Sequence, residues 1–281
     1  MYQQAFFYFC SFLFIFFVHA NNLERPRNYD KEEHEKFLKS KQKCISDLVF
    51  SMPSRPKLEY LMTIASGWRR RLASESKVSD WQYFGKLRDE DIISNFYLAG
   101  ASYMGEKIDL ILKNSELVES VENMSFSGAA VKKFLIKSSL EGEDFQLTQI
   151  LHFSGDYPLW NYDVPRIFAT GHFKYTWWHT SANSAKRIIE LLENVVEKIY
   201  DEQDKEKVFL EIAKFHWWFS QASPYMRGSA AIAEVICQSL LDFKGFKLEK
   251  IPYLMIDIEV LCEPNPQEFI RSYQRFYREK V

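Results

Sequence analysis

Residues 213–241 of this chain read as two helices joined by the loop 223–229. Apolar residues recur three and four positions apart on both sides of the loop, which itself contains Pro224 and Gly228. A loop of this kind fixes the point at which the second helix begins. The free backbone N–H groups at a helix N-terminus attract anions, so the pattern predicts both a helical core and the place where a site would lie.

The same apolar spacing, with capping residues and breakers, predicts a mainly α protein. Residues 145–153 and 155–179 have strand-like composition instead. We therefore expect a helical bundle with a short β-hairpin or flap, divided into an N-terminal helical region (21–165) and a core in the C-terminal half (166–281). The expected helices span 31–50, 57–72, 91–103, 115–138, 181–200, 206–221, 230–243 and the residues after Asn265.

The first twenty residues have the character of a targeting segment. Residues 5–18 form an uncharged apolar run that is too short for a comfortable transmembrane helix, and Val18 and Ala20 are small residues at the positions a signal peptidase reads. We expect a signal peptide over 1–20, cleaved after Ala20, and a secreted or exported protein. The alternative is an uncleaved anchor, which is the only route to a membrane in this interpretation.

Charge and cysteine content exclude some classes of partner. The formal net charge of −2 provides no basic surface for nucleic acid. The one dense basic run, 69–71, is expected to be a solvated helix face, with a lipid or phosphate patch as the alternative. The cysteines left after cleavage are odd in number and widely spaced, which argues against a disulfide framework and a zinc site. They are Cys44, Cys237 and Cys262, and sequence leaves their redox state open.

Several residues around the loop form a recognisable pattern. Pro224, Tyr225 and Gly228 lie within it, and His216 stands seven residues before Ser223. Over roughly 171–269 this order resembles the Fic (fido) superfamily, whose core is a helix, a loop His-Pro-Phe-x-(Asp/Glu)-Gly-Asn-Gly-Arg and a buried helix. The resemblance implies a fido-like core over 166–281, in a family whose members mostly transfer AMP onto a protein hydroxyl.

The chemistry of that family does not carry over to this loop. Ser223 stands at the position of the catalytic His, Arg227 at that of the metal-holding acid and Ser229 at that of the Asn. A serine without a partner base is a poor proton acceptor at neutral pH. Arg227 reverses the charge that a divalent cation needs. We therefore expect no metal, no cofactor and no adenylyl transfer, and the sequence identifies no catalytic residue.

A ligand site at the loop is still compatible with the residues present. The Arg227 guanidinium, the backbone N–H groups after Gly228 and the Ser229 hydroxyl could converge on one oxyanion. In the alternative interpretation, Gly228 allows close helix packing, Ser229 caps the helix and Arg227 pairs with a surface carboxylate. The candidate ligand-binding residues are Ser223, Tyr225, Arg227, Gly228, Ser229 and His216.

These observations lead to three functional hypotheses. The first is an effector or adaptor that works as a non-canonical or catalytically inactive protein-interaction module with a protein partner. The second is a transferase that uses a nucleotide or another phosphorylated ligand bound at Arg227-Gly228-Ser229. The third is a helical structural protein unrelated to the Fic superfamily. We expect the first.

Overall fold

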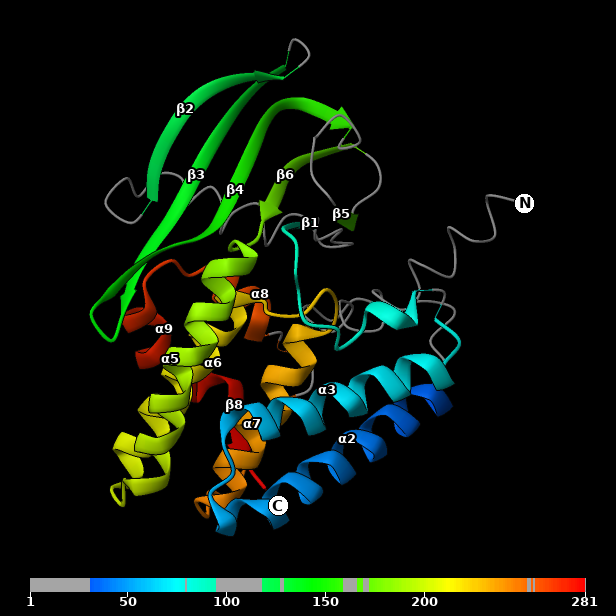
Figure 1. Cartoon of the computed structure of the whole chain (residues 1–281), viewed down its shortest axis with the longest axis vertical. Helices are drawn as coiled ribbons and strands as arrows, with labels where there is room; N and C mark the ends of the chain where they lie inside the picture. Colours follow the sequence, from blue (N-terminus) through cyan, green and yellow to red (C-terminus); the bar gives the residue numbers. More distant parts are fainter. Residues whose placement is uncertain are drawn as a thin grey trace.

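The computed structural model describes residues 31–78, 80–94, 118–126, 129–158, 166–168, 172–251, 254 and 256–280. A core of helices forms one end of the molecule and a twisted sheet extends from it (Figure 1). The expected signal peptide lies outside these ranges. Within them, no helix is both long enough and apolar enough to span a membrane.

Two N-terminal helices form an antiparallel pair along one side of the core (Figure 1). They are α2 (Lys31–Ser51) and α3 (Leu58–Glu75), separated by the short 3-10 helix η1 (Met52–Ser54), and both were predicted. Proline within η1 stops α2, as expected. The predicted inner face of α3 is buried, and both helices pack against α7.

The C-terminal half supplies the remaining helices of the core. These are α5 (Ala182–Asp201), α6 (Lys205–Ala222), α7 (Ser229–Phe243), α8 (Ile256–Leu261) and α9 (Pro266–Ser272), which the 3-10 helix η4 (Tyr273–Phe276) follows. Side chains cap the first turns of α5, α6 and α9; at Ser181, for example, the hydroxyl accepts a 3.1 Å bond from the Ser184 N–H. Asn265 caps α9 with a 2.9 Å bond from the Gln267 N–H, as the sequence predicted. The mainly helical core is therefore confirmed.

The β part is a six-stranded sheet in the order β2-β3-β4-β6-β1-β5, so it is larger than a single hairpin. All neighbouring strands run antiparallel except β1 and β5. A second small sheet joins β7 (Leu248–Lys250) to β8 (Tyr277–Glu279). The six strands are β1 (Ile92–Ser94), β2 (Val118–Phe126), β3 (Ala129–Leu140), β4 (Glu143–Pro158), β5 (Arg166–Phe168) and β6 (His172–Trp178).

Two of the expected helices are wrong. Residues 115–138 were predicted as one helix interrupted by Gly128, whereas 118–126 and 129–140 are the paired strands β2 and β3; Gly128 itself is outside the described residues. Residues 91–103 were also predicted as a helix, but their described part contains β1. Long-range strand pairing overrides local helix preference in both places. The strand expected over 145–153 is confirmed within β4.

The β3–β4 hairpin anchors the sheet to the helical core. Ile136, Leu140 and Phe145 belong to the same buried cluster as α5 and α6, and the Phe145 ring lies 5.9 Å from that of Trp218. Glu141 at the hairpin turn accepts bonds from Lys198 and Lys214, each at 2.8 Å. The expected division of the chain at residue 165 stays a prediction.

Candidate functional site

The loop between α6 and α7 is held in a conformation that its residue types favour. Ser223 ends α6 in the left-handed region with φ of 44°, and Gly228 precedes α7 with φ of 89°. Glycine adopts a positive φ without strain, which suits Gly228, whereas Ser223 takes it as the left-handed C-cap of α6. The Ser229 hydroxyl accepts a 3.1 Å hydrogen bond from the Tyr225 N–H, and it lies 3.5 Å from the Ser223 hydroxyl. Ser223, Tyr225, Gly228 and Ser229 therefore lie together in this loop.

A segment far away in the sequence lies against this loop, and we call residues 80–91 the strap. The Gly85 N–H donates to the Arg227 carbonyl at 3.0 Å, and the Met226 N–H donates to the Lys86 carbonyl at 2.8 Å. Gly85 has φ of 65°, and a Cβ there would stand 2.4 Å from the Ser66 carbonyl oxygen. The strap therefore depends on a glycine to pass closely over α3 and reach the loop.

Two residues of the strap, Asp80 and Phe84, lie together with Arg69 of α3 and Arg227 of the loop. We call these four residues the arginine cluster. The Arg69 and Arg227 guanidinium carbons lie 4.3 and 4.8 Å from the centre of the Phe84 ring, and Arg227 forms a close ion pair with Asp80. Arg69 comes from α3 and is only 4% exposed. Arg227 therefore holds the ion pair with Asp80, while the buried Arg69 lies near enough to feel the charges of both.

The electrostatics of this cluster are unbalanced. Burial, together with the neighbouring Arg227 charge, lowers the pKa of Arg69 to about 10, so it stays protonated at neutral pH. The Nε and Nη1 groups of Arg69 find no hydrogen-bond acceptor in the part of the chain that the structure describes. Leaving buried charged donors unmatched costs several kcal/mol, on the order of 1–3 for each group. An anion placed here would relieve this cost.

A third arginine lies on the other side of the loop. One Nη of Arg88 donates to the carbonyls of Thr180 at 2.6 Å and Ala222 at 2.8 Å, while its Nε and Nη1 groups have no acceptor among the described residues. Burial lowers the pKa of Arg88 to about 10, and Asp91 offsets part of that shift. Buried positive charge therefore lies near both ends of the loop, with Arg88 at Ala222 and Arg69 at Gly228.

Two further candidate ligand-binding residues, Tyr225 and His216, form hydrogen bonds inside the core. Tyr225 is 2% exposed, and its hydroxyl donates to the Met62 carbonyl at 3.3 Å. His216 lies on α6, outside the arginine cluster. It is buried, and its Nδ1 lies 2.7 Å from the Tyr273 hydroxyl. Burial lowers the pKa of His216 to about 3, so it is neutral. Trp217 and Trp218 are also buried, so both belong to the core.

A second charged cluster lies further along α7 and includes Glu234, Lys41, Lys250 and Asp257. Lys41 of α2 forms a close ion pair with Glu234, and Lys250 of β7 lies 3.5 Å from it. Burial would raise the pKa of Glu234, but the charges of Lys250 and Lys41 outweigh it and hold the value at about 2. Burial raises the pKa of Asp257 to about 6, with Lys250 opposing and Glu234 adding to the shift. This cluster joins α2, α7, β7 and α8.

Sequence reasoning missed three members of the arginine cluster. Arg69 was expected on a solvated face together with Arg70 and Arg71, but it is buried. Asp80 and Phe84 carried no motif at all. The glycines Gly85 and Gly228 were the sequence signal that could have indicated this contact. Both adopt a positive φ at a point where two segments approach each other closely.

The cysteines behave as core residues. Cys44, Cys237 and Cys262 are present as buried thiols. Burial raises the pKa of the Cys44 thiol to about 12 and that of Cys237 well above its usual value. A protonated, buried thiol is a poor nucleophile, so neither of these two residues is a candidate for catalysis.

Comparison with known families identifies the chain. The model of the AvrB_AvrC family, described as an avirulence protein, matches residues 102–280, which is more than half of the chain. No curated protein matches it. The resemblance to the Fic (fido) superfamily is wrong: the family matched over 171–269 is a different one, and the shared loop residues are ones that generic helix ends and tight turns also favour. An avirulence effector is exported or delivered to a host. This chain belongs to the AvrB_AvrC family and is an effector-type avirulence protein.

Proposed function

We propose that the protein acts by binding a host protein, and that the arginine cluster receives an anionic group in that complex. The observation that carries the proposal is the buried Arg69 guanidinium, whose Nε and Nη1 groups have no acceptor among the described residues although Arg227 lies beside it. A phosphate or carboxylate can accept from a guanidinium through two parallel bonds. Arg227 and the N-terminus of α7 would add to the attraction.

Exposed apolar side chains beside the cluster support a protein partner. Trp81 and Leu87, both on the strap, are 42% and 58% exposed. Tryptophan and arginine are enriched at the energetically important centres of protein interfaces. The anionic group could then belong to the partner itself or to a free phosphorylated molecule, and the chemistry that recognises it is the same.

A thermal-shift titration tests the anion site. The wild type is measured with inorganic phosphate, pyrophosphate, nucleotides and a phosphoserine peptide, beside Arg69→Met, Arg227→Ala and the control Arg71→Ala. A ligand at 100 times its Kd adds about 2.7 kcal/mol, or several degrees for a domain of this size. We expect a shift in the wild type and the control that both cluster variants lose. A shift with the peptide alone assigns the anion to a protein, whereas equal shifts in all four proteins would refute the site.

Affinity capture from host extract tests the partner contact. The double variant Trp81→Ser/Leu87→Ser is compared with Leu38→Ser/Phe50→Ser, which changes two exposed apolar residues on α2. We expect at least one host protein to be retained by the wild type and the α2 variant and lost by the strap variant. Identical capture by all three would contradict an interface at the strap.

The transferase alternative uses the same site, so the ligand titration decides whether an assay for group transfer is warranted. Export through a signal peptide cleaved after Ala20 is a separate proposal. Mass spectrometry of the N-terminus of exported protein tests it: a mature chain that begins at Asn21 supports cleavage, and an intact Met1 rejects it.

A further inference from the structure

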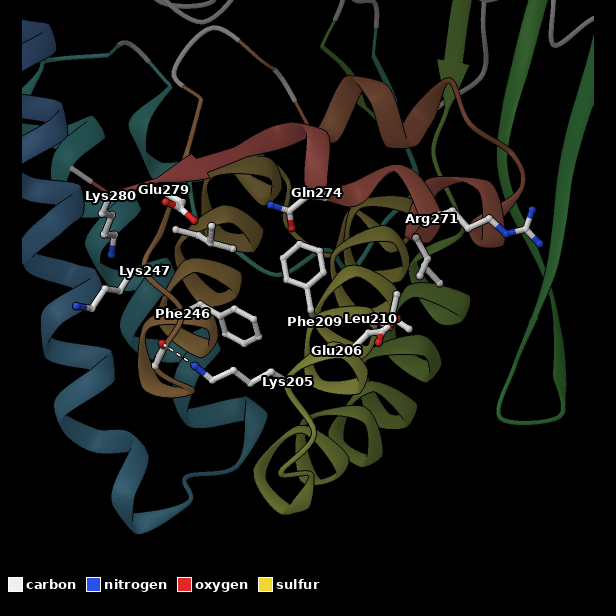
Figure 2. Close-up of a pocket in the computed structure, with 13 residues that line it drawn as sticks. Lys205, Glu206, Phe209, Leu210, Phe246, Lys247, Arg271, Gln274, Glu279 and Lys280 are labelled. Carbon is white, nitrogen blue, oxygen red and sulfur yellow. Dashed lines mark hydrogen bonds between the residues drawn. The ribbon is translucent and has the colours of Figure 1, made fainter.

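A groove opens between the start of α6, the link after α7, and the C-terminal segments α9, η4 and β8 (Figure 2). Its volume is about 730 Å³, within the range of roughly 300–1,000 Å³ that is typical of ligand sites. None of its lining residues belongs to the arginine cluster or the strap. It is therefore a separate feature of the surface.

Two phenylalanine rings form the floor of the groove. Phe209 and Phe246 have ring centres 5.8 Å apart, and both are partly buried. The buried Tyr273 ring stands 5.3 Å behind Phe209 and holds it in place. Leu210 adds an aliphatic side chain that is 39% exposed. The floor is thus a fixed apolar surface that can receive an apolar side chain without rearrangement.

The rim is mainly basic, although the whole chain has a net charge of −2. Arg271 pairs with Glu268, and Lys280 lies 2.6 Å from Asp242. Among the described residues no carboxylate lies within 4 Å of Lys205 or Lys247, whose ammonium groups stand at one end of the groove (Figure 2). The groove contains four basic lining residues, Lys205, Lys247, Arg271 and Lys280, against the two acids Glu206 and Glu279.

Lys205 places a positive charge directly beside the apolar floor of the groove. Its Nζ donates to the Gly245 carbonyl at 3.3 Å and lies 5.6 Å from the centre of the Phe246 ring. A neutral carbonyl at that distance is a weak partner for an ammonium group. A carboxylate from a ligand could therefore replace or join it while an adjacent side chain rests on Phe246.

We propose that this groove binds a short peptide segment of a partner protein in which an aromatic or aliphatic residue is flanked by acidic ones. The apolar side chain packs between Phe209 and Phe246, and the acid pairs with Lys205 and Lys247. Glu206 and Glu279 on the same rim repel a polyanion, which argues for a peptide rather than a nucleic acid. The inference goes beyond the proposed function, because it needs no residue of the arginine cluster.

Fluorescence anisotropy on the full chain provides the test. The probes are labelled hexapeptides with one Phe or Leu between two Asp or Glu residues, a matched set with Lys in place of the acids, and a labelled oligothymidylate. We expect the acidic set to bind in the micromolar to sub-millimolar range, with affinity at least tenfold above that of the basic set and the oligonucleotide. No acidic peptide binding below 1 mM, or tighter binding of the oligonucleotide, overturns the proposal.

Variants locate the binding in the groove. Lys205→Glu/Lys247→Glu should weaken the acidic peptides at least tenfold, and Lys205→Gln/Lys247→Gln should weaken them less, with unchanged melting. The control Lys207→Glu makes a charge reversal at an exposed position of α6 outside the groove and should have no effect. Equal losses in the control and the double variant would reject the site. Arg69→Met should bind the acidic peptides as tightly as the wild type. The peptide measurement therefore tests the groove even if the arginine cluster binds no anion.

Discussion

Two largely buried charged clusters differ in charge balance: the arginine cluster, which lies just before the start of α7, and the cluster around Glu234 within α7. Around Glu234, the charges of Lys41 and Lys250 face those of Glu234 and Asp257. In the arginine cluster, the charges of Arg69 and Arg227 face the carboxylate of Asp80, which forms its ion pair with Arg227. A balanced cluster can be complete within the fold, whereas an excess of buried positive charge leaves room for the anion that we propose. The difference in charge balance distinguishes a structural cluster within α7 from the candidate anion site that precedes this helix.

The largest effect is expected at the balanced cluster. Glu234→Ala leaves Lys41 and Lys250 without their shared carboxylate, so the free energy of unfolding should fall by about 3–5 kcal/mol. Urea denaturation measures it. The quadruple variant Lys41→Met/Glu234→Leu/Lys250→Met/Asp257→Asn, which removes every charge of the cluster, should recover most of the loss. A loss below about 1 kcal/mol for Glu234→Ala would show that this cluster is not a joint of the fold.

The next effect tests the close approach of α3 to the loop. Gly228→Ala should cost about 2–3 kcal/mol, because Gly228 has φ of 89° and a Cβ there would stand 2.9 Å from the Arg69 Cγ. Gly245→Ala is the matched control, since φ is 74° but nothing lies within 4 Å of its Cβ. The control should lose only about 1 kcal/mol. Equal losses would mean that backbone conformation alone, without the contact to Arg69, accounts for the cost.

A pH titration resolves the two acids of the balanced cluster. The pKa of Asp257 is raised to about 6 in the folded state, so its favourable contribution is present below pH 4 and lost as pH rises to about 6. Glu234 acts oppositely: its contribution is present above pH 4.5 and lost as pH falls towards 2. Asp257→Asn should thus match the wild type at pH 4 and exceed its stability at pH 7, by about 2 kcal/mol. A pH-independent difference would contradict this account.

The smallest effect on stability is expected at the unbalanced cluster. Arg69→Met removes a charge whose Nε and Nη1 groups have no acceptor among the described residues, and a similar volume still packs on Phe84. The free energy of unfolding should therefore stay within about 1 kcal/mol of the wild type. If this variant loses as much as Glu234→Ala, then Arg69 is also a structural residue and the distinction between the two clusters fails.

The helices were predictable from sequence because their signals are local. The apolar spacing of α5, α6 and α7, the caps at Ser181 and Asn265, and the break at η1 all act within a few residues. Strands β2 and β3 were missed because their stability comes from pairing with each other and with β4. Part of the loop geometry was predicted as well, including the role of Gly228.

The members of the arginine cluster could not be predicted in the same way. Arg69 lies within a run of three arginines, and nothing local distinguishes the one that is buried from its two neighbours. Its burial follows from the strap, which reaches the loop across α3 and brings Asp80 and Phe84 with it.

The sequence by itself determined the helical core and the capped ends of α5 and α9, since these depend on side chains close together in the chain. Only the tertiary structure decided which charges are buried, which of them are balanced and where the groove opens. These properties depend on contacts between segments more than a hundred residues apart, such as Asp80 with Arg227 and Lys41 with Glu234. Burial makes such contacts energetically significant, because a charge is expensive to remove from water unless a partner meets it.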